Sequence, residues 1–146
     1  MWKTTDLGAH WTEFTGKGLP TRWVNSIVVD PTDANHVYVA YSGYREGDLS
    51  ANVWETRNGG STWTNISGKL PNSPVEMLAY DAVGSGLYAA TDLGVFMDKN
   101  GKSNWVRVGR GLPNTPVLDI KITADRKTLY AATFGRSVWS TPLPSR

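Results

Sequence analysis

The chain has 146 residues, of which 40% are hydrophobic and 19% are charged, a composition typical of about one folded domain. A net charge of +2, with scattered lysines and arginines, argues against nucleic acid as a partner, and no apolar run approaches the roughly 20 residues of a membrane span. The absence of cysteine excludes disulfides and thiolate-bound metals, while seven tryptophans and six tyrosines favour β-strands.

The sequence repeats internally. A Leu-Pro pair occurs at residues 19–20, 70–71 and 112–113, a spacing of roughly 40 to 50 residues that is typical of a repeated structural unit. Within one unit we expect four short strands separated by Gly, Asp, Asn or Ser turns, as at residues 75–80, 87–91, 95–98 and 104–108. No window shows the apolar spacing and capping signals of a helical repeat, so the predicted fold class is all-β.

In chain order, residues 1–18 supply the third and fourth strands of one unit. Residues 19–69 and 70–111 form two complete units with four strands each, and residues 112–146 form a last unit that lacks its fourth, outer strand. The segment at residues 11–14 is an outer strand, and we expect it to complete a sheet elsewhere.

A recurring turn motif joins the third strand to the fourth. It reads hydroxyl, any residue, Asp or Asn, any residue, Gly, two further residues and Trp. The Asp or Asn side chain accepts hydrogen bonds from turn amides, glycine allows positive φ, and tryptophan packs on the neighbouring sheet. We therefore expect all three motif tryptophans to be core residues. The third copy is degenerate, because Lys102 replaces the glycine and Asp98 replaces the hydroxyl residue. The motif residues are Thr4, Asp6, Gly8 and Trp11, then Thr56, Asn58, Gly60 and Trp63, then Asn100 and Trp105.

On these motifs the sequence resembles the Asp-box proteins, also called bacterial neuraminidase repeat proteins. They include sialidases, sortilin-type propellers, xyloglucan-cleaving glycosidases and many exported bacterial proteins. The resemblance covers nearly the whole chain and implies β-propeller blades in an extracellular or cell-surface bacterial protein, although residues 1–5 lack the apolar core of a signal peptide. In that family the box is a structural turn away from the active face, so it implies little about activity.

About three four-stranded blades are too few to close a ring, since propellers have about four to eight. The remaining blades of the ring come either from a longer parent chain, of which this would be the C-terminal part, or from a second copy of the chain. We favour the longer chain, because the third strand occurs at both ends, at residues 2–4 and 139–141, and leaves one strand surplus in a closed pair.

One face of the predicted blades carries two departures from the repeat. Arg22 and Trp23 interrupt a connection that otherwise reads Asn-Ser-Pro or Asn-Thr-Pro, and the loop at residues 41–51 is longer than its equivalents. Aromatic rings beside arginines suit sugar stacking or a protein hot spot; alternatively, Trp23 fills space and the loop is a solvated insertion. Asp92 and Arg136 lie in matching turns at the inner rim, with a structural salt bridge as the favoured alternative to ligand contact. The ligand-binding candidates are Arg22, Trp23, Tyr44, Arg45, Asp92 and Arg136.

No catalytic residue is expected, because a glycosidase needs two carboxylates flanking the bond and none is paired in this sequence. His10 and His36 are far apart on the opposite face, and residues 30–35 lack the spacing of a calcium motif, so we expect no metal and no cofactor. The predicted function is a non-catalytic scaffold for glycan or protein partners. The alternatives left open are part of a propeller glycoside hydrolase whose catalytic residues lie outside this chain, and a self-assembling structural piece.

Overall fold

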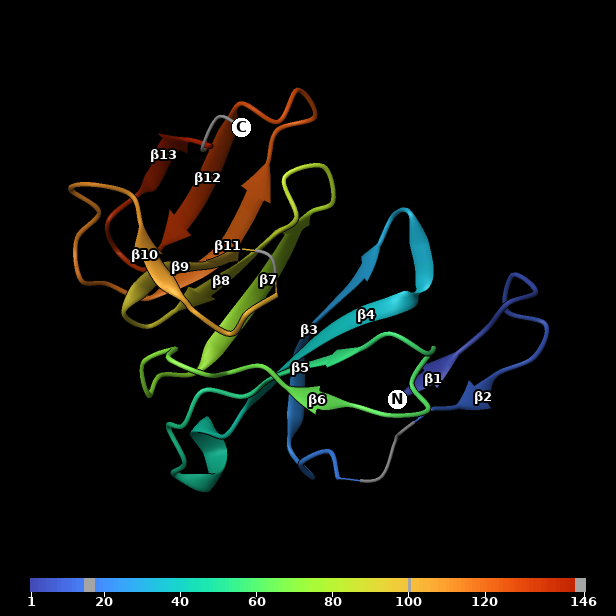
Figure 1. The fold of residues 1–146 in the computed structure, drawn as a ribbon. Helices are drawn as coiled ribbons and strands as arrows, with labels where there is room; N and C mark the ends of the chain where they lie inside the picture. Colours follow the sequence, from blue (N-terminus) through green and yellow to red (C-terminus); the bar gives the residue numbers. More distant parts are fainter. Residues whose placement is uncertain (15–17, 100, 144–146) are drawn as a thin grey trace.

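The computed structural model describes residues 1–14, 18–99 and 101–143 (Figure 1). These residues form antiparallel sheets and one single-turn 3₁₀ helix, η1 (Tyr44–Glu46). Sheet I contains β1 (Trp2–Lys3) and β2 (Thr12–Glu13). Sheet II contains β3 (Trp23–Asp30), β4 (Asp33–Ser42), β5 (Val53–Thr56) and β6 (Thr64–Asn65). Sheet III contains β7 (Val75–Asp81), β8 (Gly86–Thr91), β9 (Gly94–Lys99) and β10 (Val106–Val108), and sheet IV contains β11 (Val117–Ile122), β12 (Thr128–Thr133) and β13 (Val138–Pro142).

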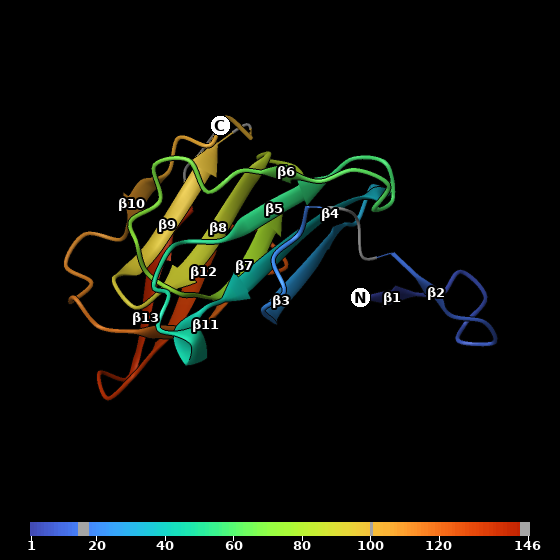
Figure 2. The ribbon, with the colours of Figure 1, turned by 90° about the horizontal axis from the view of Figure 1, so that it is seen from below.

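The predicted all-β class is confirmed, and each sheet is a meander in which consecutive strands pair. Figures 1 and 2 show that sheets II, III and IV follow one another through the molecule, while the β1–β2 hairpin projects on the side opposite β13. Within the described residues, residues 11–14 complete none of sheets II, III and IV, so their pairing with a sheet elsewhere stays a prediction. Thr12 and Glu13 pair with Lys3 and Trp2, and the ring stays open.

Two apolar clusters join the three larger sheets. Tyr38 and Ala40 of β4 share one buried cluster with Val75 and Leu78 of β7. Tyr88 and Ala90 of β8 share a second cluster with Val117 and Ile120 of β11. Because each fully buried Val, Leu or Ile side chain contributes about 1.5–3 kcal/mol, these junctions are a main source of stability. The alternation along each strand places one set of side chains against the preceding sheet and the other against the following sheet.

The turn motif forms the hydrogen bonds expected of it. The Thr56 hydroxyl accepts from the Gly60 amide at 3.0 Å, and the Asn58 side chain accepts from the Thr62 amide at 2.9 Å. Gly60 has φ +92°, and a Cβ there would lie 2.5 Å from a ring atom of Phe14. A side chain at this position would therefore both strain the backbone and clash with the hairpin.

The first copy forms the same two bonds, and the degenerate copy forms a different set. The Thr4 hydroxyl accepts from the Gly8 amide and the Asp6 carboxylate from the His10 amide, both at 2.9 Å. In the degenerate copy, the buried Asp98 carboxylate accepts from the amides of residues 103 and 104 at 2.9 and 3.0 Å. The Asp98 carboxylate therefore binds two turn amides from the position that a threonine holds in the other copies. Asn100, the predicted motif residue, lies outside the described residues.

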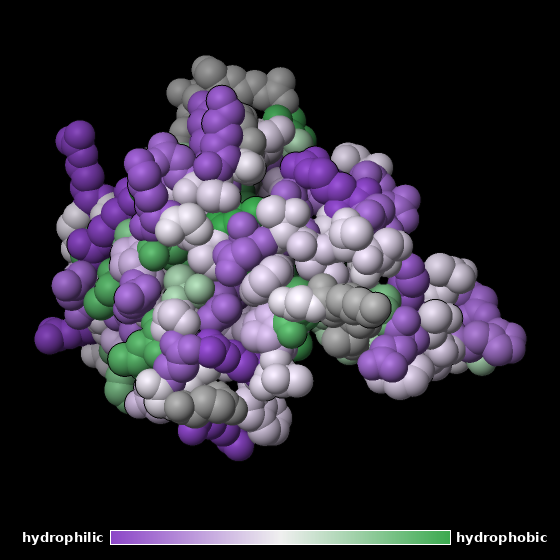
Figure 3. All heavy atoms as spheres, turned by 60° about the horizontal axis from the view of Figure 1, so that its bottom comes forward, coloured by the Kyte–Doolittle hydropathy of each residue, from purple (hydrophilic) through white to green (hydrophobic). Residues whose placement is uncertain are grey.

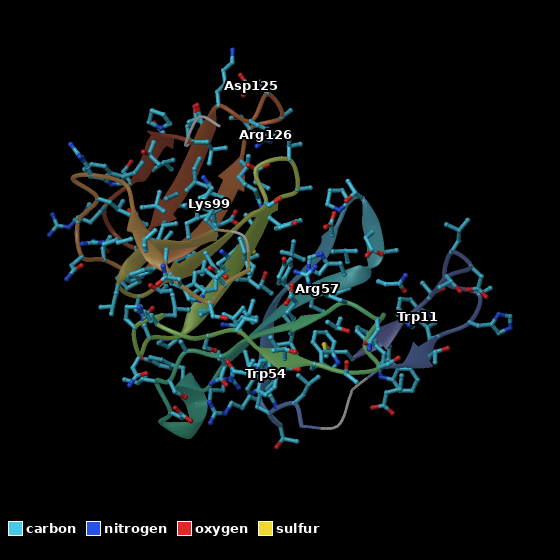
Figure 4. All side chains as sticks on the ribbon, viewed as in Figure 1. Trp11, Trp54, Arg57, Lys99, Asp125 and Arg126 are labelled. Atoms are coloured by element: carbon cyan, nitrogen blue, oxygen red, sulfur yellow. The ribbon has the colours of Figure 1, made fainter. Side chains whose placement is uncertain are left out.

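The motif tryptophans differ in burial, so the prediction that all three are core residues is wrong for Trp11. Trp105 is 5% exposed and donates from Nε1 to the Ile66 carbonyl of sheet II at 2.8 Å, whereas Trp11 is 58% exposed. Trp63 is partly buried, with its ring centroid 6.2 Å from that of Phe14 in the hairpin. Trp63 and Trp105 pack against the preceding sheet, whereas no described sheet precedes the hairpin that carries Trp11 (Figure 4).

Candidate functional site

The face that carries the irregular loop centres on Trp23, the first residue of β3. Its ring is more than half exposed, and the guanidinium carbon of Arg45 in η1 lies 4.7 Å from the ring centroid. This distance permits a cation–π interaction, which holds the indole face and the arginine together. Tyr44, the residue before Arg45, is also mostly exposed. The structure therefore brings Trp23, Tyr44 and Arg45 to one place, as the sequence predicted.

Arg22 anchors the long loop to the start of β3 through an ion pair with Asp48. The Asp48 carboxylate also accepts from the hydroxyl and the amide of Ser50, at 2.5 and 2.8 Å. These two Ser50 hydrogen bonds, and then Arg22, hold the pKa of Asp48 at about 2. Arg22 thus ties together the two departures from the repeat and positions the loop that carries Arg45. The side chain of Glu46, in the same loop, lies outside the described part of the chain.

Two hollows border Trp23. The first has a volume of about 270 Å³ and combines two aromatic rings with polar side chains. Its lining residues are Trp23, Asn25, Ser42, Tyr44, Arg45 and Glu76. The second, of about 460 Å³, lies beside the start of β3 and is lined by Met1, Pro20, Thr21, Arg22, Trp23, Val24 and Tyr41. We call Trp23, Asn25, Tyr44, Arg45 and Glu76 the Trp23 site.

Sequence reasoning missed Asn25 and Glu76. The Asn25 side chain donates from Nδ2 to the Glu76 carboxylate at 3.0 Å and to the Val75 carbonyl at 3.1 Å, which fixes the carboxylate against β3. Burial raises the pKa of Glu76, and the nearby charge of Asp92 raises it further. The repeat did contain a signal for Glu76. This charged residue lies on the first strand of its unit, at the position where the last unit has Leu118.

Asp92 lies in the turn between β8 and β9, where its amide donates to the Ser73 hydroxyl at 3.0 Å. Burial raises the pKa of Asp92 as well. Arg136 is exposed in the equivalent turn of sheet IV, and its carbonyl accepts from Nε1 of Trp139 at 2.7 Å. The ion pairs of the described residues do not include one between Asp92 and Arg136, so the favoured salt bridge is wrong.

The raised pKa of Glu76 gives a testable pH dependence. A carboxyl whose folded pKa lies above its ordinary value of 4.5 favours the folded state below that value and loses this contribution as pH rises through the folded pKa. We expect Glu76→Gln to abolish this loss. Urea titrations at pH 4 and pH 7 should show a smaller fall in unfolding free energy for the variant than for the wild type. An equal fall in both proteins would contradict a raised pKa for the partly buried Glu76.

The opposite face holds a second polar cluster that the sequence did not reveal. His36 is buried between two carboxylates, with Nδ1 3.0 Å from Asp30 Oδ2 and Nε2 2.7 Å from Glu55 Oε1. Arg57, labelled in Figure 4, adds a 2.7 Å contact to the same Glu55 oxygen. The ring of Tyr38 lies 4.6 Å from that of His36. Both imidazole nitrogens therefore contact carboxylate oxygens, and the cluster links His36, Asp30, Glu55 and Arg57 in one buried polar network.

A hollow of about 380 Å³ adjoins this cluster. Because the Asp30, His36, Glu55 and Arg57 side chains already pair with one another, we assign the cluster a structural role.

Within residues 1–14, 18–99 and 101–143, no group of three or more His, Asp or Glu side chains is arranged to hold a metal ion. In the described part of the chain, no helix is long and apolar enough to cross a membrane. Figure 3 shows polar side chains interspersed with small apolar patches on the surface seen from below.

Comparison with known proteins identifies the architecture. No protein-family model and no curated protein matches the sequence. Among solved structures, an ancestral GH74 enzyme superposes with a TM-score of 0.65 at 21% identity, over 83% of this chain and 19% of that enzyme. A gluconolactonase from Xanthomonas campestris gives 0.63 at 15% identity, over 84% and 38% of the two chains. The GH74 xyloglucanase from the same organism gives 0.60 at 13% identity, over 80% and 20%.

The chain therefore spans about one fifth of the length of the GH74 enzymes that it matches. At these identities the likeness establishes the fold. Together with the four-stranded meanders and the paired apolar junctions, it shows that the described residues form successive blades of a β-propeller whose ring is not closed.

Proposed function

We propose that this chain is a non-catalytic part of a larger propeller ring and that it binds glycans through the Trp23 site. The observation that carries the proposal is the exposed Trp23 ring, stacked by Arg45 and bordered by a hollow with Asn25 and Glu76 in its lining. An aromatic face packs on the apolar side of a sugar ring, and amide and carboxyl groups at its edge bind hydroxyls. A xyloglucanase and a gluconolactonase, both named for sugar substrates, share the fold.

The Trp23 site suits one sugar unit of a glycan better than the broad surface of a protein partner. Its hollow measures about 270 Å³, and its polar groups converge from different blades, Asn25 from β3 and Glu76 from β7. Side chains held by rigid strands recognise hydroxyl groups at fixed positions, while the η1 loop supplies the exposed Tyr44 and Arg45.

Removal of the aromatic platform tests the proposal. We expect Trp23→Ala to weaken binding to any glycan found on an array by at least about tenfold, since truncating a hot-spot aromatic costs about 2 kcal/mol. Trp11→Ala is the matched control, because Trp11 is equally exposed and lies on the hairpin. Titration calorimetry with the strongest glycan measures both variants. Unchanged affinity in Trp23→Ala, or capture of proteins but no glycan, would refute the assignment.

Glycoside hydrolysis is the second candidate, and the observation that favours it is a pair of carboxyls, Glu76 and Asp92, that adjoin the register pair Val75–Thr91 of sheet III. Both carboxyls have raised pKa values, with Glu76 on β7 and Asp92 in the turn after β8. A carboxyl with a raised pKa retains the proton that a general acid donates to a leaving sugar. If the wild type releases reducing ends from a glycan and Glu76→Gln does not, hydrolysis is supported. If the wild type binds glycan without releasing reducing ends, the binding function is supported.

A further inference from the structure

The β3 face of the chain exposes apolar side chains that are buried at the same positions of the other blades. Ile27 stands eight residues after the first Leu-Pro pair begins, as Leu78 and Ile120 do in the next units. Leu78 and Ile120 are 3% and 1% exposed, yet Ile27 is 49% exposed. Val24 shows the same contrast with Val75 and Val117. We define the β3 face by Val24, Ile27 and Val29, all of which are exposed.

Two junctions within the chain show what covers such a face. Leu78 lies in a buried cluster with Tyr38 and Ala40 of the preceding sheet. Ile120 lies in the equivalent cluster with Tyr88 and Ala90. In both cases the second strand of the preceding blade supplies a tyrosine and, two residues later, an alanine that lets the sheets approach closely. A β3-type face is therefore matched by a Tyr-x-Ala strand.

The chain presents that strand, uncovered, at its other side. Tyr130 of β12 is followed by Ala131 and Ala132, in register with Tyr38 and Tyr88 of the other blades. Tyr38 and Tyr88 are 3% and 2% exposed, but Tyr130 is 46% exposed. We define the β12 face by Tyr130, Ala132 and the neighbouring exposed Phe134. Figures 1 and 2 place β12 and β13 at the side of the molecule away from the hairpin.

We propose that a second copy of this chain seats its β12 face on the β3 face of the first, repeating a junction that the chain itself makes twice. The contact is head to tail, because it joins two different faces. Two such contacts close a pair of copies into one ring, whose number of blades falls within the range of known propellers. The pairing covers both apolar faces at once, which neither face achieves in a single chain.

The pairing requires one local rearrangement. By the repeat, β1 and β13 both occupy the third position of a blade, so they compete for one place at the new junction. The hairpin is the weaker element, because β1 and β2 share two register pairs and β12 and β13 share five. We expect the hairpin to move outward. The surplus strand, which at the sequence level favoured a longer parent chain, therefore does not prevent pairing.

Two variants, one altered on the β3 face and one on the β12 face, test the head-to-tail contact without knowledge of the ligand. The 146-residue wild type is expected to show the mass of two copies by light scattering. Ile27→Glu and Tyr130→Glu each place a charge in both contacts of the ring, so each variant alone should have the mass of one copy. Mixed in equal amounts, they should regain the mass of two copies, because one contact then joins two unaltered faces.

The control is Val106→Glu, at an apolar residue of similar exposure on the outer strand β10, which should leave the mass of two copies unchanged. Circular dichroism checks that each variant keeps the wild-type strand content. A wild type with the mass of one copy would overturn the proposal in favour of blades from a longer chain. Variants that stay paired alone, or that do not pair when mixed, would overturn it as well.

Discussion

Replacement of Trp105 by alanine is expected to lower the free energy of unfolding by about 3–5 kcal/mol, the usual cost of truncating a buried tryptophan. Trp105 is 5% exposed within the cluster that joins sheets II and III. The truncation leaves a cavity there and removes the 2.8 Å hydrogen bond from Nε1 to the Ile66 carbonyl. Urea unfolding followed by circular dichroism, which does not depend on tryptophan fluorescence, measures the loss.

Trp11→Ala is the matched control, because Trp11 has the same place in the turn motif and is 58% exposed. A substitution at such a surface position changes stability by about 0.5 kcal/mol or less. Trp63, which is partly buried, should give an intermediate value at the same protein concentration. Equal losses for all three variants would show that the motif, rather than the preceding sheet, determines the contribution of each tryptophan.

Much of the fold could be predicted from the sequence because its determinants are local and repeated. The strands expected at residues 75–80, 87–91 and 95–98 match β7, β8 and β9 within a few residues. The turn motif also required only short-range information, since the Asp or Asn side chain bonds amides a few residues away. Three copies of one pattern made each assignment stronger than a single segment would allow.

Burial at the edges could not be predicted from the motif alone. Trp11 and Tyr130 carry the same residue types as their buried equivalents and are exposed because no described blade covers them. The repeat predicts the face of a strand on which a side chain lies. Whether another blade covers that face depends on how the blades assemble, which the motif does not specify.

The candidate site was predicted in part. Trp23, Tyr44 and Arg45 stood out because they break the repeat, and the structure brings them together. Glu76 was missed because its partner Asn25 lies on another blade, so no sequence spacing links them. Similarly, His36 was judged by its distance in sequence from His10, whereas its partners are the carboxylates of Asp30 and Glu55.

The second large effect is expected at this histidine. His36→Ala should lower the free energy of unfolding by about 3–5 kcal/mol, because removing the partner of a buried carboxylate leaves that carboxylate without compensation. Here two buried carboxylates, Asp30 and Glu55, would lose their shared donor, at distances of 3.0 and 2.7 Å. Urea denaturation at pH 7 measures the loss. Replacement of the exposed His10 is the control and should have a much smaller effect.

Acid titration separates this electrostatic role from simple packing. Burial acts to raise the pKa of Asp30, but hydrogen bonds from Thr32 and His36 outweigh it and hold that pKa at about 2, below the ordinary 3.8. A depressed pKa stabilises the fold above the ordinary value, and this contribution is lost as pH falls toward 2. Without His36, the pKa of Asp30 should rise, so His36→Ala should lose less stability than the wild type between pH 4 and pH 2. If both proteins lose the same amount over this range, His36 stabilises the fold by filling space and not by its pairing with Asp30.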